Sequence, residues 1–566
     1  MEPHLPTLFD AVADARPDAP ALHTPEGVTT WGALKRRTDA LGAALHASGV
    51  SGAPSSSTTE DGWVCPNPRV ALYLHNHPAY LEAMVGAWKA RATSANVNYR
   101  YLAGELVPLL DDARPAAFVY HQCFAPTLGD VLDRLDTTPQ LWCVPDGSGH
   151  QLLPGARWYE DVLAEAPPLP QSLRRDWSPD DRYLVYTGGT TGAPKGVLWR
   201  QRDFAVAALG FDPTLLDGPG GITGWAEALP ARAPRSLVAP PFMHGAAHWN
   251  ALAVWLKGGT VVLPAHPERF DPEAVLDAVQ WGEATAMIIV GDAFARPLLE
   301  ADARSPRPLR SLRHLLTGGA ILSPAVKAEL VGRWPHLTIV DVLGSSESGR
   351  QAVQRHRTRG PTGADEPEPR AFRPGDNTVI VSEGGHDVVD PKRQPPGAAP
   401  GEVGWLARTG RVPLGYLGHP EATRATFPVI GGLRVAVTGD RARYRRDGGI
   451  ELLGREAACI NTGGEKVFAE EVEERLRHHP SVLDLVVAPA TDDQFGQAVG
   501  VVATARGGAP LRLEQLREFG RAHLADYKLP RRLVVVDQVQ RSPSGKPDYT
   551  WARRQLDGGA GGEGWG

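Results

Sequence analysis

Apolar runs of strand length alternate with segments of helical periodicity along most of the chain. The apolar run at 70–74 precedes a helical pattern over 79–89, and the run at 286–290 precedes another over 294–301. This alternation is typical of parallel sheets whose strands are joined by helices that cover the sheet. The pattern therefore predicts an α/β fold with a large body of mainly parallel β-sheets covered by helices.

The character of the chain changes near Gly454. Beyond it lies a unit of roughly domain size, with a predicted helix over 469–478 and a predicted strand over 533–536. We therefore expect a small C-terminal α+β domain beside the large body. The Gly-rich tail is predicted to be disordered, because it offers little apolar surface to bury. The predicted units are the large N-terminal domain 1–453, the C-terminal domain 459–556 and the tail 557–566.

Composition narrows the possible classes of function. The 566 residues carry a formal net charge of −6, whereas generic nucleic-acid binding needs a basic footprint. The four cysteines form no CxxC pair, which is typical of buried thiols in a reducing cytosol. Pro240 and Pro241 interrupt the apolar stretch 236–256, which is interpreted as a buried strand, turn and helix. We expect a cytoplasmic protein with no transmembrane segment and no nucleic-acid partner.

A glycine- and threonine-rich loop gives the strongest local signal. It runs from Tyr186 to Gly196, directly after the apolar strand 183–185. Glycines let backbone N–H groups approach an anion closely, and threonine hydroxyls and a lysine add donors and positive charge. Pro194 and Gly196 exclude a Walker P-loop, and a purely structural hairpin is the alternative. The candidate phosphate-binding residues are Thr187, Gly188, Gly189, Thr190, Thr191, Gly192 and Lys195.

This loop resembles the signature phosphate loop of the adenylate-forming superfamily, which includes acyl-CoA synthetases, peptide-synthetase adenylation domains and beetle luciferases. Four further motifs follow in that family's order, and the resemblance spans about residues 5–552. They are Gly344-Ser345-Ser346-Glu347, Thr438-Gly439-Asp440, Gly454-Arg455 and Ser544-Gly545-Lys546. The segments 98–101, 291–297 and 459–467 are similar to those of bacterial fatty- and steroid-acyl-CoA synthetases.

The resemblance implies a nucleotide site for ATP and Mg²⁺. Ser346 and Lys546 match family residues at the α-phosphate, and Glu347 matches the Mg²⁺ ligand, so these three are the catalytic candidates. Mg²⁺ prefers carboxylate and phosphate oxygens, which suits a glutamate in this position. Asp440 matches the aspartate that binds the ribose hydroxyls. Considered alone, Lys546, Glu347 and Asp440 are also explained as a solvated lysine, a helix-start carboxylate and a turn residue. Further nucleotide-site residues implied by the resemblance are Gly318, Gly319, Ala320, Gly344, Ser345 and Arg455.

An acid pocket and a CoA tunnel are also implied by the resemblance. A hinge at 454–458 would make the C-terminal domain a mobile lid that presents Gly463 and Gly464 to the pantetheine arm, although a tight turn explains these glycines equally well. His244 is explained equally well as a core histidine. Leu343 stands where many members place an aromatic residue under the adenine. The implied pocket residues are His244, Val290, Gly291, Gly319, Leu343 and Gly344.

The sequence therefore predicts an AMP-forming ligase that activates an apolar or aromatic carboxylic acid as an acyl-adenylate and transfers it to CoA. Relatives in natural-product pathways use other acceptors, so carrier-protein loading, amide formation and nitrite-activating diazotisation of an aryl amine stay open. A non-catalytic nucleotide-binding homologue is a third hypothesis. It is disfavoured because suitable residues stand at the phosphate, metal, ribose and lysine positions. The expected partners are a small-molecule acid and, as one option, a second copy of the chain in a homodimer.

Overall fold

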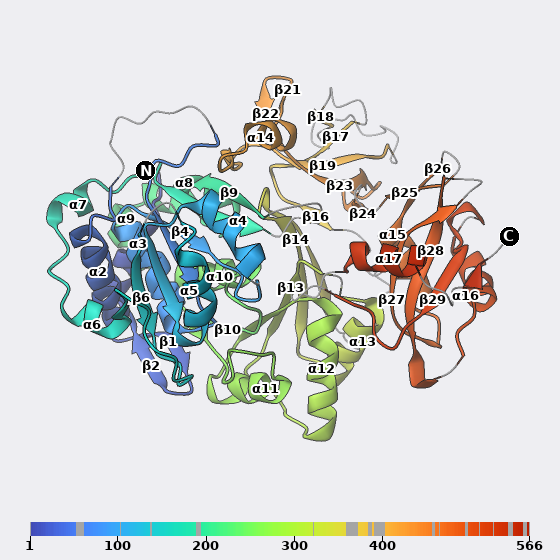
Figure 1. The fold of residues 1–566 in the computed structure, drawn as a ribbon, viewed down its shortest axis with the longest axis horizontal. Helices are drawn as coiled ribbons and strands as arrows, with labels where there is room; N and C mark the ends of the chain where they lie inside the picture. The colour runs from blue at the N-terminus through green and yellow to red at the C-terminus, as the bar shows by residue number, and fades with distance from the viewer. Residues whose placement is uncertain are drawn as a thin grey trace.

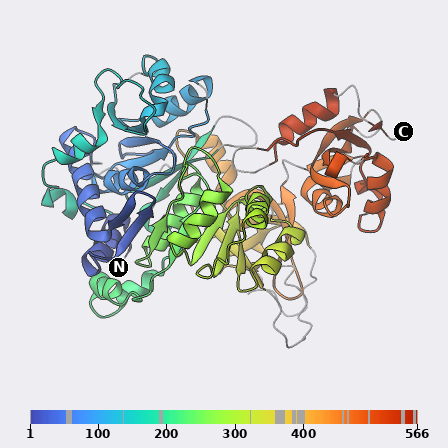
Figure 2. The same ribbon diagram turned by 90° about the horizontal axis from the view of Figure 1, so that it is seen from below.

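The computed structural model divides into a large body and a smaller C-terminal unit (Figure 1). In both views the red C-terminal unit lies beside the yellow-green part of the body and away from its blue N-terminal sheet (Figures 1 and 2). The described residues are 2–52, 62–101, 103–135, 138–187, 194–320, 322–357, 372–382, 388–389, 402–455, 459–462, 465–492, 496–508, 510–524, 526–541, 547–558 and 563–564.

A nine-stranded sheet forms the centre of the body. Its order is β16-β15-β14-β13-β12-β10-β11-β1-β2, with the six strands from β14 to β1 parallel and antiparallel strands at both edges. These strands are β1 (Pro20–Thr24), β2 (Gly27–Thr30), β10 (Arg235–Val238), β11 (Thr260–Val262), β12 (Ala286–Ile289), β13 (His314–Gly318), β14 (Thr338–Ser345), β15 (Gly349–Arg357) and β16 (Arg373–Pro374). The helices between them are α10 (Gly245–Trp255), α11 (Pro272–Trp281), α12 (Gly291–Arg304) and α13 (Pro324–Arg333).

A second, fully parallel sheet lies in the N-terminal part of the body. Its order is β4-β3-β5-β6-β7, and its strands are β3 (Arg69–Tyr73), β4 (Thr93–Asn96), β5 (Ala117–His121), β6 (Gln140–Val144) and β7 (Arg157–Trp158). The helices of this part are α1 (Leu5–Ala15), α2 (Trp31–Ala47), α3 (Pro78–Lys89), α4 (Ala103–Ala113), α5 (Ala125–Leu132), α6 (Tyr159–Ala164) and α7 (Gln171–Arg175). The predicted α/β class with a body of mainly parallel sheets is confirmed.

Three smaller sets of antiparallel strands complete the body. The first holds β8 (Arg182–Thr187), β9 (Lys195–Arg200) and β20 (Gly415–Tyr416). The second holds β17 (Thr378–Val381), β18 (Val388–Val389), β19 (Gly404–Arg408), β23 (Ala436–Tyr444) and β24 (Ile450–Arg455). The third is the hairpin of β21 (Val429–Ile430) and β22 (Leu433–Arg434). The remaining helices of the body are α8 (Gln201–Ala207), α9 (Gly221–Glu227) and α14 (Pro420–Thr426).

The C-terminal unit is a sheet with helices packed on it. Its strands are β25 (Cys459–Thr462), β26 (Glu465–Phe468), β27 (Val482–Asp492), β28 (Gly496–Ala505), β29 (Arg532–Val535) and β30 (Glu563–Gly564). Its helices are α15 (Ala469–Leu476), α16 (Leu513–Arg521) and α17 (Tyr549–Gly558). The predicted helix over 469–478 corresponds to α15, and the strand predicted over 533–536 corresponds to β29. Residues 456–458 lie outside the described residues, so the hinge at 454–458 and the division into 1–453 and 459–556 stay predictions.

Residues 557, 558, 563 and 564 of the predicted disordered tail are among the described residues. Asp557 is still in α17, where its carboxylate accepts a hydrogen bond of 3.0 Å from the Thr491 backbone N–H of β27. The strand β30 then pairs with β29. The other residues of the tail lie outside the described residues, so its disorder stays a prediction.

Candidate functional site

The two ends of the glycine- and threonine-rich loop are held together by a strand pair. Thr187, at the end of β8, lies opposite Lys195, at the start of β9, in antiparallel register. The loop residues between them, Gly188, Gly189, Thr190, Thr191 and Gly192, lie outside the described residues. The structure therefore fixes both ends of the predicted phosphate loop at one edge of a three-stranded sheet.

A chain of contacts joins this loop to the predicted metal ligand. The Lys195 Nζ lies 5.8 Å from the ring centroid of Tyr416 in the neighbouring strand β20. The Tyr416 hydroxyl donates a hydrogen bond of 3.1 Å to Oε1 of Glu347. Burial raises the pKa of the Tyr416 hydroxyl, so this group keeps its proton and stays a donor. Three segments that are far apart in the sequence thus meet at one point.

The backbone around Glu347 is fixed by the turn between β14 and β15. The Ser345 hydroxyl accepts a hydrogen bond of 3.2 Å from the Glu347 backbone N–H. The indole N–H of Trp199 in β9 donates one of 3.0 Å to the carbonyl oxygen of Ser346. Gly344 is required here, because a Cβ atom at this position would lie 2.2 Å from the carbonyl oxygen of Gly349. These bonds present the 345–347 segment toward the loop at β8 and β9.

Sequence reasoning identified the motif residues but missed the two aromatic residues that hold them. Tyr416 and Trp199 carry no motif, and Trp199 is fully buried. A strand position with an aromatic residue is ordinarily a core position, so nothing in the sequence distinguishes either residue. Their role becomes visible only when the distant segments are brought together.

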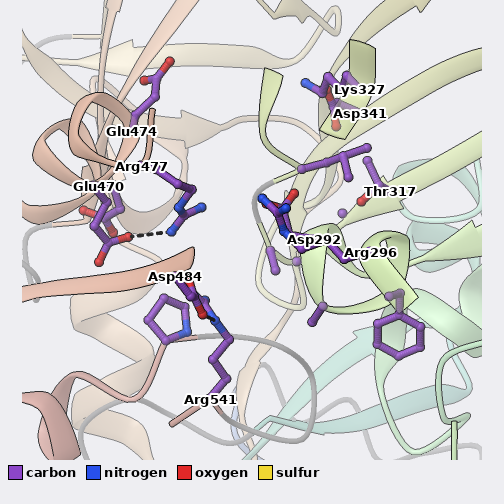
Figure 3. Close-up of a pocket in the computed structure, with 18 of the residues that line it drawn as sticks. Asp292, Arg296, Thr317, Lys327, Asp341, Glu470, Glu474, Arg477, Asp484 and Arg541 are labelled. Atoms are coloured by element: carbon purple, nitrogen blue, oxygen red, sulfur yellow. Dashed lines mark hydrogen bonds and ion pairs between the residues drawn. The ribbon is translucent and has the colours of Figure 1, made fainter. Parts of the chain in front are cut away.

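A cavity of about 1560 Å³ lies between the body and the C-terminal unit. One side is formed by the ends of β13 and β14, which are parallel neighbours with Gly318 opposite Val342. The opposite side is formed by charged residues from α15 and from later segments of the C-terminal unit (Figure 3). We call the first side the body wall, which comprises Thr317, Gly318, Gly319, Ala320, Asp341, Val342, Leu343, Gly344 and Asp440. We call the second side the C-terminal wall, which comprises Glu470, Glu473, Arg477, Asp484, Arg541 and Tyr549.

The body wall brings together five of the predicted nucleotide residues. Gly318 ends β13, Gly319 and Ala320 follow it, and all three line the cavity together with Gly344 near the end of β14. Gly319 has a φ of +81°, a conformation that glycine adopts without strain. Asp440 lies on β23, where its carboxylate accepts a hydrogen bond of 2.7 Å from the Thr438 hydroxyl. This bond orients a carboxylate that is only 6% exposed.

The predicted hinge residue Arg455 lies next to the predicted ribose ligand in the sheet. Arg455 is opposite Asp440 in the antiparallel pair of β23 and β24. The lysine of the last motif, Lys546, lies outside the described residues, as do Gly463 and Gly464. The structure therefore brings Gly318, Gly319, Ala320, Gly344 and Asp440 together at the cavity, whereas Thr187, Lys195, Ser345, Ser346 and Glu347 are not among the residues that line it. The assignment of a nucleotide site stays a prediction.

The predicted acid pocket is brought together in part. Gly319, Leu343 and Gly344 line the cavity. Val290 and Gly291 begin α12, and the Gly291 backbone N–H donates a hydrogen bond of 3.0 Å to the Thr317 hydroxyl of the body wall. His244 precedes α10, and neither it nor the 290–291 pair is among the residues that line this cavity.

His248, one helical turn beyond His244, is a core histidine. Its ring nitrogens contact the Phe242 carbonyl oxygen at 2.7 Å and the Tyr183 hydroxyl at 2.5 Å. Burial lowers the pKa of His248 to about 4, so the imidazole is neutral near pH 7. This residue is explained by its packing and needs no functional role.

Charged groups on both walls have partners. On the body wall the Asp341 carboxylate forms an ion pair with Lys327, and burial raises the pKa of Asp341. On the C-terminal wall Arg541 binds Asp484 at 2.6 Å (Figure 3). Glu473 is fully buried there, accepts a hydrogen bond of 2.9 Å from the Val487 backbone N–H and has its pKa raised to about 7 by burial.

A divalent cation fits this site only together with a phosphate-bearing ligand. Within the described ranges, no group of three or more His, Cys, Asp and Glu side chains could hold a metal ion. Glu347, beside the ends of the loop, is a single carboxylate oriented by a neutral donor. Mg²⁺ is bound in many phosphate sites by one or two carboxylates and phosphate oxygens, which is compatible with this donor set. In the part of the chain that the structure describes, no helix is long and apolar enough to span a membrane.

Comparisons with known proteins cover almost the whole chain. A family model described as AMP-binding enzyme matches residues 9–417, and a model of the AMP-binding enzyme C-terminal domain matches residues 471–546. The medium-chain acyl-CoA ligase Mig of Mycobacterium avium is 38% identical over 553 residues, which cover 97% of this chain and 98% of that relative. The 3-oxocholest-4-en-26-oate–CoA ligase of Rhodococcus rhodochrous is 33% identical over 568 residues, covering 98% and 96%.

Solved structures show a similar fold. The amide bond synthetase McbA from Marinactinospora thermotolerans matches with a TM-score of 0.75, and the match covers 98% of this chain and 100% of that one. The sequence identity is 23%. At this level the likeness concerns the arrangement of helices and strands, and fold alone does not determine a reaction.

Proposed function

The chain belongs to the AMP-binding enzymes, and from this we propose that it is an ATP-dependent acid–CoA ligase that releases AMP. The two relatives named above are both acyl-CoA ligases and match this chain nearly end to end. The proposed acid is an apolar or aromatic carboxylic acid, bound where Gly319, Leu343 and Gly344 line the cavity. A cytoplasmic location and a homodimer stay predictions from the sequence.

The observation that carries the proposal is the contact chain from Lys195 through Tyr416 to Glu347. The Lys195 ammonium, at one end of the predicted phosphate loop, lies over the Tyr416 ring, and the Glu347 carboxylate accepts a hydrogen bond from the hydroxyl of the same ring. A triphosphate offers negative oxygens to the lysine and, through a divalent cation, to the carboxylate. A purely structural hairpin would need neither charge.

In the first half-reaction the acid carboxylate attacks the α-phosphorus of ATP. A carboxyl oxygen–phosphorus bond forms, the bond from this phosphorus to the bridging oxygen breaks, and pyrophosphate leaves. The residues of this chain position the reactants and neutralise charge, since phosphoryl chemistry asks for little else. Lys195 and the loop would hold phosphate oxygens, Ser346 and Lys546 the α-phosphate, and Asp440 the ribose hydroxyls. Mg²⁺, held by Glu347 and phosphate oxygens, would neutralise the charge that develops on the leaving pyrophosphate.

In the second half-reaction the CoA thiolate attacks the acyl carbon of the adenylate. A carbon–sulfur bond forms, the carbon–oxygen bond to AMP breaks, and the thioester and AMP are released. We propose that the C-terminal unit turns at 454–458 between the two steps, so that Lys546 withdraws and the 463–464 turn approaches the CoA arm. Domain rotation of this kind commonly gates sequential reactions.

The experiment is an acceptor test with purified protein, ATP and Mg²⁺. Pyrophosphate release is followed with a panel of medium-chain, alicyclic and aromatic acids, and CoA, hydroxylamine or nitrite with an aryl amine is then added. A CoA thioester identified by mass spectrometry supports the proposal. Adenylate without thioester replaces it with one of the other acceptors, and release of AMP that is independent of any acid contradicts it.

Two variants test the assigned residues in the same assay. Lys546→Ala is expected to abolish most acid-dependent AMP formation, and unchanged formation would refute the role given to this lysine. Lys528→Ala is the matched control, because Lys528 also belongs to the C-terminal unit and pairs with Glu471 at 2.7 Å. The control is expected to keep adenylate formation near the wild-type rate.

A further inference from the structure

Two buried asparagines join the parallel N-terminal sheet to the strand that leads into the loop. Asn67 lies two residues before β3, and Asn96 is the last residue of β4. Their side chains are 1% and 7% exposed. A buried side-chain amide is ordinarily fully hydrogen-bonded, so its partners show what it holds in place.

Asn96 binds two segments of the candidate site at once. Its Oδ1 accepts a hydrogen bond of 2.7 Å from the backbone N–H of Tyr186, and its Nδ2 donates one of 3.0 Å to the carbonyl oxygen of the same residue. The same Nδ2 donates a second bond of 2.6 Å to the carbonyl oxygen of Met243. Tyr186 directly precedes Thr187, and Met243 directly precedes His244. One amide thus binds Tyr186, which directly precedes the first candidate phosphate-binding residue, and Met243, which directly precedes the predicted acid-pocket residue His244.

The segment before His244 has a second fixed point. Asn76 donates a hydrogen bond of 2.9 Å to the Pro240 carbonyl oxygen and accepts one of 2.6 Å from the Phe242 backbone N–H. Two amides, Asn76 from the connection between β3 and α3 and Asn96 from the end of β4, therefore hold the 240–243 segment, and of the two, Asn96 also reaches β8. Because these bonds are short and buried, displacing one segment moves the donor or acceptor that the other segment needs.

We propose that Asn96 is a positioning residue that fixes the start of the phosphate loop relative to the segment before His244. This inference rests on the proposed function, in which the acid and the α-phosphate must meet in line. A displacement of about 1 Å between reactants can lower a rate by about 100-fold. Asn96 touches neither reactant in this role and acts through the backbone of the two segments.

Asn67 provides a matched control at the other end of β8. Its Oδ1 accepts a hydrogen bond of 3.2 Å from the Arg182 backbone N–H, and its Nδ2 donates one of 2.8 Å to the Arg91 carbonyl oxygen. Asn67 is buried like Asn96 and also contacts β8. Among the described residues, its side chain forms no hydrogen bond with the 240–243 segment. The two substitutions therefore remove similar packing and similar bonds.

The test compares wild type, Asn96→Ala and Asn67→Ala. In single-turnover adenylate formation, Asn96→Ala is expected to be slower by about 100-fold, with the dissociation constant for ATP changed by no more than about threefold. Asn67→Ala is expected to lower the unfolding temperature but to keep the single-turnover rate near that of wild type. Hydrogen exchange should accelerate over 242–248 in Asn96→Ala only, and over the first half of β8 in Asn67→Ala.

Asn96→Asp gives a second readout that a general loss of packing would not produce. The aspartate retains an acceptor for Tyr186 N–H but, when ionised, places negative charge against the Met243 carbonyl oxygen. Burial without a cation raises a carboxyl pKa, and the protonated form restores a donor. The rate of this variant relative to wild type is therefore expected to rise as the pH falls from about 8 to about 6.

Three results would overturn the inference. They are a wild-type rate in Asn96→Ala, an equal loss of rate in Asn67→Ala, and unchanged exchange over 242–248 in Asn96→Ala. If wild type forms no adenylate with any acid, the proposed function fails, and the exchange experiment then decides by itself whether Asn96 couples the two segments. The two failures are distinguishable because the exchange readout requires no substrate.

Discussion

The body wall of the cavity combines glycines and apolar residues with the carboxylates of Asp341 and Asp440, whereas the C-terminal wall is lined mainly by charged side chains. Other charged residues of the body, among them the ion pair of Asp292 and Arg296, also line the cavity. Gly318, Gly319 and Gly344 bring the backbone close to the cavity. On the other side Arg541 and the fully buried Glu473 dominate. The two walls thus differ in composition, since glycines are frequent on the body wall and charged side chains on the C-terminal wall.

From this difference we predict which substitutions change activity and which change stability. Polar groups near the body wall are oriented by neighbours outside the cavity, as Tyr416 orients Glu347 and Thr438 orients Asp440. Substitutions there remove interactions with the ligand while leaving the core intact. Charges on the C-terminal wall bind each other, so substitutions there should change the stability of that unit first.

The largest expected effect is that of Glu347→Gln. Loss of the carboxylate is expected to lower acid-dependent pyrophosphate release by about 100- to 1000-fold, because charge developing on the leaving group is no longer neutralised. The Mg²⁺ concentration needed for half-maximal rate should rise, and the unfolding temperature should stay within about 2 °C of wild type. Glu329→Gln is the control, since Glu329 is an exposed residue of α13. Equal rates of pyrophosphate release for wild type and Glu347→Gln would contradict the role proposed for Glu347.

The second prediction concerns the pH dependence of the C-terminal wall. The pKa of Glu473 is raised to about 7 in the folded protein and is about 4.3 in an unfolded chain. Between these values the folded state binds the proton more tightly, so stability falls as the pH rises from about 4 to about 7 and is level above. The fall amounts to about 4 kcal/mol.

Glu473→Gln cannot ionise and should lack this fall. The free energy of unfolding, measured in urea with hydrogen exchange over 469–490 as the probe, is to be determined for wild type and variant across the pH range. The two curves should diverge in favour of the variant between about pH 5 and about pH 7. Curves that remain parallel across this range would show that Glu473 titrates normally.

Asp440→Asn is expected to act mainly on ATP. The amide keeps an acceptor for the Thr438 hydroxyl but offers the ribose one neutral acceptor in place of a carboxylate, a loss of about 1.5–3 kcal/mol. The KM for ATP should therefore rise by about 10- to 100-fold, while the KM for the acid stays close to wild type. An equal rise in both constants would place Asp440 outside the ribose site.

The smallest expected effect is that of Arg541→Ala. Its bond to Asp484 lies between side chains that are 20% and 33% exposed, and partly exposed ion pairs contribute about 1 kcal/mol or less. A small drop in the stability of the C-terminal unit is expected, reduced further at high salt. A loss of stability above about 3 kcal/mol would mean that Arg541 and Asp484 behave as a buried ion pair.

The sequence predicted the parallel body well, because strands such as 286–289 are continuous apolar runs and buried on both faces. It also indicated which motifs belong together, although not how they are held. The Lys195–Tyr416–Glu347 contact depends on side chains from two strands and one turn that are far apart in the sequence, and no local pattern encodes such a meeting. Asn96 was likewise invisible, since an asparagine at the end of a strand is ordinarily read as a turn residue.

The Asn96 bridge has a practical consequence for anyone who wishes to broaden the range of acids. Replacements at 240–244 would displace the start of the predicted phosphate loop through Asn96. Gains in selectivity for the acid would then lower the turnover rate. Leu343 is the better first position for a library, because it lines the cavity from β14. Among the described residues, Asn96 forms no hydrogen bond with the backbone of Leu343. Gly319 is the poorer choice, since its positive φ disfavours every other amino acid.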